Sequence, residues 1–257
     1  MKQKIILLFI TIFTTSFFNA QSYISSNLDN YAGIQGITIN PASIVDSPYR
    51  FDINLVSASA FGGSDYFGIS VSDITNSDGG FDFDQDVEKF PKNDSSFFFN
   101  ADVLGPSFMF NLNKKSSIGL STRVRAFLNI NNISGELYES LADGFDDTQD
   151  FIFQMENFNG TIHAWGEIGL TYARILKQTD NNLLKRGVTL KYLQGVGSAF
   201  FNSTLLAGQF DANAYALTSQ GDLNYGLSQG GFDEEDIDFS NLTAGFGFDL
   251  GFYVPME

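Results

Sequence analysis

The sequence predicts an all-β fold, an antiparallel transmembrane β-barrel with an irregular, plug-like segment near the N-terminus. Three observations support this prediction: several segments alternate apolar and polar residues, these segments are long, and the chain begins with an export signal. Alternation with a period of two gives a strand two different faces. Strands of soluble proteins mostly have about five or six residues, whereas a tilted membrane strand needs roughly 9–11.

The N-terminus has the layout of a cleavable secretory signal peptide. Lys2 and Lys4 precede a mostly apolar run that is too short for a helical membrane span, and Ala20 is a small residue at the expected cleavage point. We therefore expect export through the inner membrane to the outer membrane. The chain divides into a signal peptide, an irregular plug segment and a barrel that is expected to be partial: residues 1–20, 21–49 and 50–257.

Composition excludes several classes of function. The formal charge of −16 argues against nucleic-acid binding, which needs a basic surface. The chain has no cysteine and a single histidine, His163, so neither a disulfide framework nor a zinc site nor Cys/His catalysis is expected. No nucleophile elbow or phosphate-binding loop is present in the sequence. We predict no enzymatic activity, no cofactor and no metal centre.

The segment from Ser117 to Asn131 has the clearest alternation, with mostly apolar residues at even positions and mostly polar residues at odd ones. Residues 161–172, 188–192, 205–218 and 241–254 follow the same pattern, and about eight strands are expected in all. The apolar sides of these strands are predicted to meet lipid and the polar sides a hydrated interior. The charges expected to face that interior are Arg123, Arg125, Glu167, Lys191, Asp211 and Asp249.

The sequence also predicts a bend in one strand and a short helix. In residues 97–112 the alternation changes phase near Gly105 and Pro106, which predicts a bulge or bend. Residues 134–145 predict a short helix that Ser134 caps and that packs on its own loop.

The acidic loops at residues 78–88 and 233–238 could bind a divalent cation weakly, but neither has the spacing of a helix-loop-helix calcium site. The last alternating segment stops just before Met256 and Glu257, without the terminal aromatic residue usual for outer-membrane barrels. We therefore expect the chain to be a fragment of a longer barrel, since an open sheet edge in lipid leaves backbone groups unsatisfied.

A soluble, secreted β-sandwich or solenoid is the alternative, because its sheets also have one apolar and one polar face. Such a protein would serve as a binding or adhesion domain. Strand length, aromatic content and the export signal together favour the membrane barrel.

Residues 30–55, NYAGIQGITINPASIVDSPYRFDINL, join a glycine- and proline-rich stretch to an alternating strand. Its INPAS element resembles the N-terminal Asn-Pro-Ala of the long-chain fatty-acid transporter superfamily. The wider stretch resembles a Bacteroidota outer-membrane family of unknown function, whose layout is similar to barrels of the type IX secretion pathway. The resemblance implies that Asn40, Pro41 and Ala42 form a plug inside the barrel. It also implies passage of a hydrophobic solute or a scaffold for surface-protein export, with outer-membrane lipid and export or envelope proteins as partners.

Overall fold

The computed structural model describes residues 32–68, 87–90, 92–145, 149–179, 182–228 and 243–254. The predicted signal peptide, most of the acidic stretch at 78–88 and the acidic stretch at 233–238 lie outside these residues. None of the helices within the described ranges has the length and apolar character needed to cross a membrane.

The described chain is mostly antiparallel β-structure, as the sequence predicts, and most of its strands form one large sheet. A separate two-stranded sheet joins β3 (Phe67–Gly68) and β4 (Glu88–Lys89). The strands of the large sheet are β1 (Phe51–Asn54), β2 (Ser57–Ser64), β5 (Ser95–Leu104), β6 (Ser107–Asn113), β7 (Ser116–Ile133), β8 (Phe151–Thr179), β9 (Asn182–Asp211), β10 (Ala216–Gly221), β11 (Asn224–Leu227) and β12 (Ala244–Tyr253).

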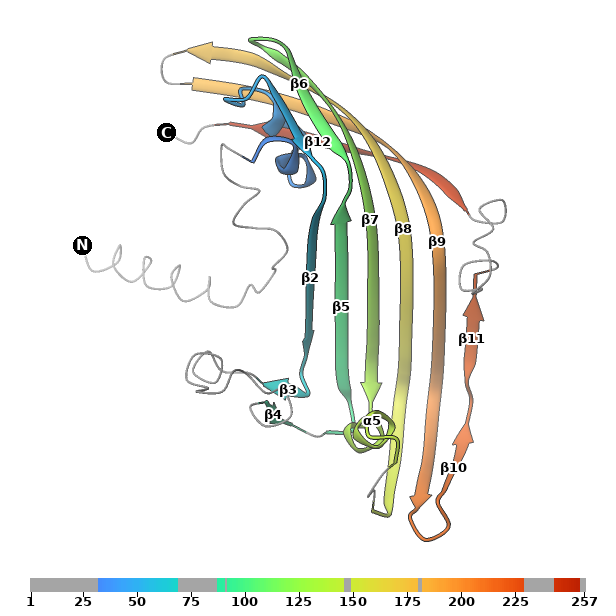
Figure 1. Ribbon diagram of the computed structural model, residues 1–257. Helices are drawn as coiled ribbons and strands as arrows, with labels where there is room; N and C mark the ends of the chain where they lie inside the picture. Colours follow the sequence, from blue (N-terminus) through green and yellow to red (C-terminus); the bar gives the residue numbers. More distant parts are fainter. Residues whose placement is uncertain are drawn as a thin grey trace, which may run out of the picture.

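The long strands β7, β8 and β9 form the centre of the sheet, and shorter strands follow one another along its sides (Figure 1). On one side β5 and β6 pair with successive parts of β7, and β2 and β1 pair with β5 and β6. On the other side β12, β11 and β10 pair with successive parts of β9. The break between β5 and β6 falls at Gly105 and Pro106, where the sequence predicts a bend.

The sequence-based division of β9 is wrong. Residues 188–192 and 205–218 are predicted to lie in separate strands, but residues 188–192 and the first part of the second range both belong to β9, which runs for 30 residues. The second of these ranges is instead divided by a turn, in which the Asp211 carboxylate accepts hydrogen bonds from the backbone N–H groups of Asn213 and Ala214 (2.9 and 3.0 Å). A residue that caps a turn this way ends the strand, since its side chain replaces the ladder partners of the backbone.

The sheet has two open edges within the described residues. β1 and β2 form one edge, and β10, β11 and β12 form the other. The described strands therefore make an open, curved wall, and the closed transmembrane barrel with its plug remains a prediction.

One face of this wall is apolar and exposed. Residues that are register partners on neighbouring strands lie on the same face, so the pairing defines rows across the sheet. Two such rows are apolar from β1 to β12: Phe51, Phe110, Ile118, Tyr172, Val188 and Leu250 in one, and Ile53, Phe108, Leu120, Leu170, Leu190 and Phe248 in the other. Leu190, Phe248 and Leu250 each have more than 60% of their surface exposed.

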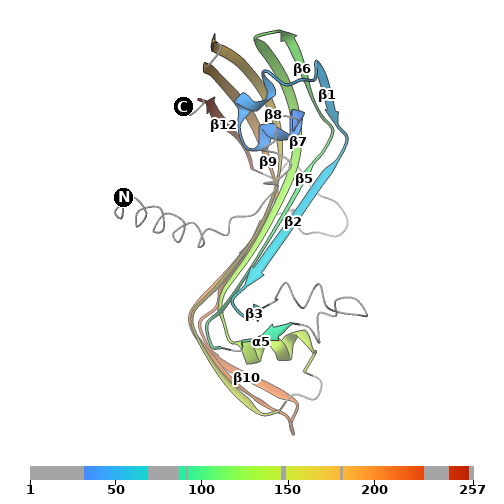
Figure 2. The same cartoon turned by 90° about the vertical axis from the view of Figure 1, so that its left-hand side faces the viewer.

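The other face is polar and is partly covered by the N-terminal part of the described chain. Two 3₁₀ helices, η2 (Gly33–Thr38) and η3 (Pro41–Ile44), lie against the upper part of this face (Figures 1 and 2). We call residues 33–45 the docking segment. Its apolar side chains form a core with three residues of the sheet and complete one buried cluster: Ile34, Ile37, Ile44, Val45, Met109, Ala173 and Ile175.

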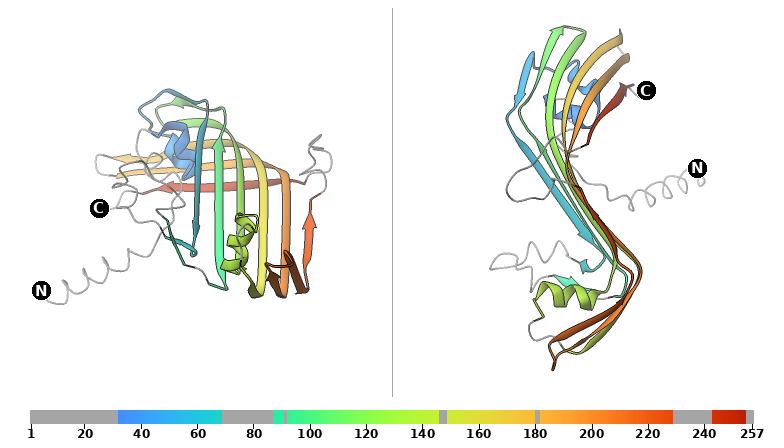
Figure 3. Two further views of the ribbon diagram at one scale, coloured as in Figure 1. Left: turned by 60° about the horizontal axis from the view of Figure 1, so that its bottom comes forward. Right: turned by 90° about the vertical axis from the view of Figure 1, so that its right-hand side faces the viewer.

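The helix α5 (Gly135–Ala142) lies at the opposite end of the sheet and on the opposite face (Figure 2). Its residue Tyr138 stacks on Phe97 with ring centroids 4.4 Å apart, and Phe97 is the register partner of Ile130 in an apolar row. The sheet bends between the docking segment and α5, so each is held in a separate concavity (Figures 2 and 3).

The predicted helix is therefore present, but two details differ. Ser134 is at the N-cap position without making a side-chain capping bond, and Leu137 is buried against Phe153 and Met155 of β8, so the helix packs on the sheet and not only on its own loop.

Candidate functional site: the polar face and its docking segment

The three predicted plug residues lie on the polar face, where β9 and β12 run side by side. The Asn40 side chain accepts a hydrogen bond from the backbone N–H of Ala42 (2.9 Å) and so caps η3. Its Nδ2 donates to the carbonyl of Phe252 in β12 (2.9 Å). Pro41 occupies the first position of η3, where its missing N–H costs no hydrogen bond. Asn40 thus both starts the short helix and ties it to the last described strand.

The sheet beneath the docking segment is made of small residues. A Cβ atom added to Gly187 would lie 2.5 Å from Ala42 N, and one added to Gly251 would lie 2.8 Å from Pro41 Cδ. Gly187 and Gly251 are register partners, and Ala173 of β8 continues the same row. The backbone of the segment can approach the sheet only because these positions lack larger side chains.

Polar contacts hold both ends of the docking segment. At its start, Asp52 of β1 accepts a hydrogen bond from the backbone N–H of Ile34 (2.8 Å). At its end, buried Lys185 of β9 donates to the carbonyl of Val45 (3.2 Å) and pairs with Asp46 (3.4 Å). The segment is therefore fixed by an apolar core between two polar anchors.

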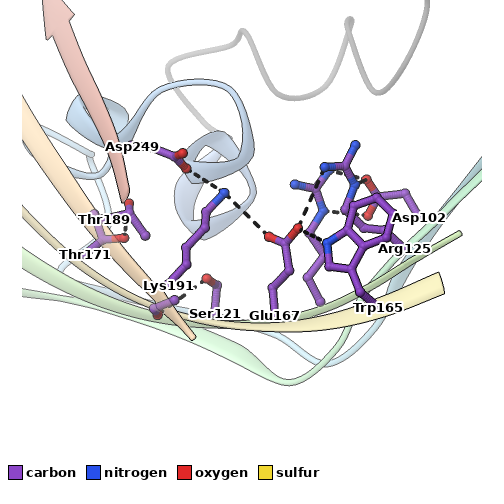
Figure 4. Close-up of polar contacts among 11 residues, drawn as sticks. Asp102, Ser121, Arg125, Trp165, Glu167, Thr171, Thr189, Lys191 and Asp249 are labelled. Carbon is purple, nitrogen blue, oxygen red and sulfur yellow. Dashed lines mark hydrogen bonds and ion pairs between the residues drawn. The ribbon is translucent and has the colours of Figure 1, made fainter. Parts of the chain in front are cut away.

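Below the docking segment, a line of charged side chains crosses the polar face from β5 through β7, β8 and β9 to β12 (Figure 4). At one end Arg123 binds Asp102 with two hydrogen bonds, one of them 2.7 Å from Nε to Oδ1. Such a bidentate pair is the strongest common form of carboxylate recognition by arginine. Because the two side chains are about nine-tenths buried, the pair is shielded from solvent screening.

Glu167 of β8 is the centre of this line. Its carboxylate lies 3.7 Å from Arg125 Nη1 on one side and 3.5 Å from Lys191 Nζ on the other, and Lys191 continues to Asp249 at 2.7 Å. Glu167 is 7% exposed, so its negative charge depends on these partners. Three acidic and three basic side chains form the line, which we call the charge line: Asp102, Arg123, Arg125, Glu167, Lys191 and Asp249.

Trp165 belongs to the polar face although it interrupts the predicted alternation. Its indole N–H donates to Glu167 (2.8 Å), and the Arg125 guanidinium lies 5.0 Å from its ring centroid. An indole that has both a hydrogen-bond partner and a stacked cation is well suited to a polar surface. Its rings also contact His163 and Phe127, with centroids 5.3 and 6.1 Å apart.

A groove of about 530 Å³ opens beside Trp165, over β9 and β12. Two glycines on its β12 side, Gly245 and Gly247, leave the sheet surface bare, and a Cβ at Gly245 would meet nothing within 4 Å. The charged rim of the groove is formed by Glu167, Lys191 and Asp249.

Five of the six predicted interior charges meet in the charge line, and one does not. Asp211 caps the turn after β9, far along the strand from the others. Asp102 was missed by sequence reasoning. The signal for it was present in the sequence. Asp102 is the one charged residue among the even positions of β5, and these positions face away from the apolar face that carries Phe99 and Val103.

A charged pair outside both faces has shifted pKa values. Burial alone would raise the pKa of Asp65, but the hydrogen bonds it accepts from Lys92 (2.6 Å) and from Ser96 N–H (2.7 Å) together hold it below its ordinary value. The same hydrogen bond raises the pKa of Lys92. No group of side chains that could hold a metal ion is found within the described ranges.

Comparison with known families identifies the chain's relationship. The profile of a family described as a family of unknown function (DUF5723) matches residues 41–255. The chain belongs to the DUF5723 family. The matched range includes Pro41 and Ala42 of the docking segment and the whole charge line. No match was found among curated proteins or among solved structures. The description of the family assigns it no function.

Proposed function

We propose that this protein forms part of the wall of an outer-membrane β-barrel that passes a solute, with the polar face turned to a hydrated interior. The observation that carries the proposal is that neighbouring residues of one strand have opposite surroundings: exposed apolar side chains on one face and paired charged side chains on the other. Leu190 is 61% exposed on one face of β9, whereas the neighbouring Lys191 is engaged by two carboxylates on the other. A bilayer accommodates the first residue and a water-filled interior the second.

The size of the apolar band supports the same proposal. On β8 the face that carries this band is apolar or small from Phe158 to Tyr172, and Arg174 follows directly beyond it. At about 3.3 Å per residue and a tilt of about 40°, a run of this length is long enough to span the apolar belt of outer-membrane barrels, which is about 25 Å tall.

In a bilayer both open edges of the sheet must be paired, because unsatisfied backbone groups are costly in hydrocarbon. The proposed wall therefore needs strands beyond those described to complete it. The docking segment would then lie inside the wall as a plug, since it covers the polar face. A hydrophobic solute and an export scaffold, both implied by the sequence resemblance, remain predictions.

The first test is the solvent that the folded protein requires. We expect the leaderless protein to fold only in detergent or lipid and to migrate differently on gels before and after heating. A monodisperse folded species in plain buffer would overturn the proposal and favour the secreted β-sandwich, in which a second sheet covers the apolar rows.

The second test concerns the plug. Deletion of residues 33–45 should raise the conductance of the reconstituted protein, since the segment covers the upper polar face. Asn40→Ala is a milder variant, because it removes only the cap of η3 and the bond to Phe252, and it should raise the conductance less than the deletion does. Equal conductance for the intact, deleted and substituted proteins would contradict a plug.

A further inference from the structure

An aromatic ring, bare backbone and charged side chains meet in the groove beside Trp165. Its lining residues come from β8, β9 and β12, and its polar rim is formed by the charge line. Ligand sites combine a mostly apolar concave surface with a few placed polar groups, and this groove has both.

Trp165 is held on one side and open on the other. Arg125, its register partner on β7, and His163, two residues earlier on β8, contact the ring. Its register partner on β9 is Gly195, which has no side chain and also lines the groove. The indole is therefore fixed in position and remains accessible from the groove.

The charges at the rim favour a neutral ligand. Lys191 lies 2.7 Å from Asp249 and 3.5 Å from Glu167, so an anionic ligand would have to displace a carboxylate from it. A cationic ligand would have to displace Lys191 itself. A ligand that carries both hydrogen-bond donors and acceptors but no charge can bind alongside these pairs without separating them.

We propose that this groove is a subsite for a sugar ring, a neutral polyhydroxylated ligand that lies against Trp165 and hydrogen-bonds to the charged rim. The apolar C–H face of a sugar fits an aromatic ring, while its hydroxyls donate to the carboxylates of Glu167 and Asp249 and accept from Lys191. The bare backbone at Gly245 and Gly247 leaves the space that the ring would occupy. The inference rests on the proposed function, because the groove must open to water inside the wall, and it names the class of solute that the wall would bind.

The test uses the intrinsic fluorescence of Trp165, the single tryptophan of the chain. The folded protein in a sugar-free detergent such as an amine oxide is titrated with maltohexaose, cellohexaose and N-acetylchitotriose, and in parallel with sodium laurate as an anionic amphiphile. We expect a saturable change with at least one oligosaccharide below about 10 mM and none with laurate.

Two valine substitutions separate binding from folding. Gly245→Val fills the groove at a position where a Cβ meets nothing, so it should weaken oligosaccharide binding at least about tenfold. Gly166→Val is the matched control, because Gly166 adjoins Trp165 on the opposite face and also has room for a Cβ. It should leave the affinity unchanged, and the heat-dependent gel shift checks that both variants fold.

Three results would overturn the subsite: no saturable change with any oligosaccharide, a change with laurate alone, or equal loss of binding in both variants. Because the titration is done in micelles, its failure leaves the detergent and conductance tests of the wall untouched. Failure of those tests together with intact sugar binding would instead indicate a soluble sugar-binding protein.

Discussion

In a water-soluble sheet the apolar face is buried and the polar face is exposed. In this sheet the apolar face is the exposed one and the polar face carries buried side chains. On the apolar face, Phe246 and Phe248 are 86% and 69% exposed. On the polar face, Glu167 and Thr171 are 7% and 0% exposed and each has a hydrogen-bond partner. Charged and hydroxyl groups are thus the ordered, protected part of the sheet, while large apolar groups are left uncovered. This difference is the observation on which the proposal of a lipid-facing side and a hydrated side rests.

The strongest way to break this arrangement is to neutralise the centre of the charge line. Glu167→Gln should destabilise the protein by about 3 kcal/mol, because Lys191 and Arg125 lose the carboxylate between them in a protected site. Chemical denaturation in detergent, followed by circular dichroism, measures the loss. Glu156→Gln, the same change at an exposed position of β8, is the control and should cost little. Equal effects of the two changes would show that the charge line is not protected.

A second way is to force the docking segment from the polar face. Gly187→Val should cost about 2–3 kcal/mol, because its side chain would enter the backbone of Pro41 and Ala42. Limited proteolysis should then cut within residues 33–45, which the intact protein protects. Gly245→Val adds the same side chain to the same face where there is room, and should leave the segment protected. Protection of the segment in both variants would contradict the close packing described for it.

A smaller effect tests the buried hydroxyl pair of the polar face. Thr171 and Thr189 are register partners whose Oγ1 atoms lie 2.6 Å apart, one donating to the other. Thr171→Val should cost about 1–2 kcal/mol, because it leaves the Thr189 hydroxyl buried and unpaired. The double variant Thr171→Val, Thr189→Val should recover much of this loss in the same denaturation measurement. A double variant that loses the sum of the two single effects would argue against a direct bond.

The smallest effect on stability is expected from the pair of Asp65 and Lys92, which lies on neither face of the sheet. Asp65 has a lowered pKa, so the stabilisation from its pair with Lys92 is present above the ordinary aspartate pKa and is lost as the pH falls through the lower value of the folded protein. Acid should therefore weaken the pair only below about pH 4. Asp65→Asn should remove this part of the acid sensitivity and leave stability at neutral pH nearly unchanged, because both side chains are well exposed.

Period-two alternation allowed the sequence to predict the strands and the division into faces. Residues 117–131 and 241–254 carry the pattern almost without interruption, and the pairing of residues 117–131 and 244–253 divides their apolar and polar side chains between two faces as expected. The length of β9 could not be predicted, because its register shifts by one residue between Gly195 and Gly197 and the shift reverses its alternation. Asp211 was misplaced for a related reason, since a turn that an aspartate caps looks like one more polar position in a strand.

The sequence predicted several residues of the candidate site but not which of them contact one another. The resemblance of the INPAS element suggested Asn40, Pro41 and Ala42 as a plug, and the structure shows them on the polar face against Gly187 and Gly251. A local sequence pattern could not predict the contacts of the docking segment with β9 and β12, because they join residues more than 140 positions apart in the chain, as between Asn40 and Phe252. The role of Trp165 depends likewise on Arg125 from a neighbouring strand.

The most direct test of the two-face account compares adjacent residues of β12. The chain has no cysteine, so Gly247→Cys and Phe248→Cys each place a single thiol on one face. Each variant is labelled with bimane and reconstituted in lipid vesicles. We predict that doxyl-labelled lipid quenches the fluorophore at residue 248 and that aqueous iodide quenches the one at residue 247. Quenching by iodide at residue 248, or by doxyl lipid at residue 247, would contradict the assignment of the two faces.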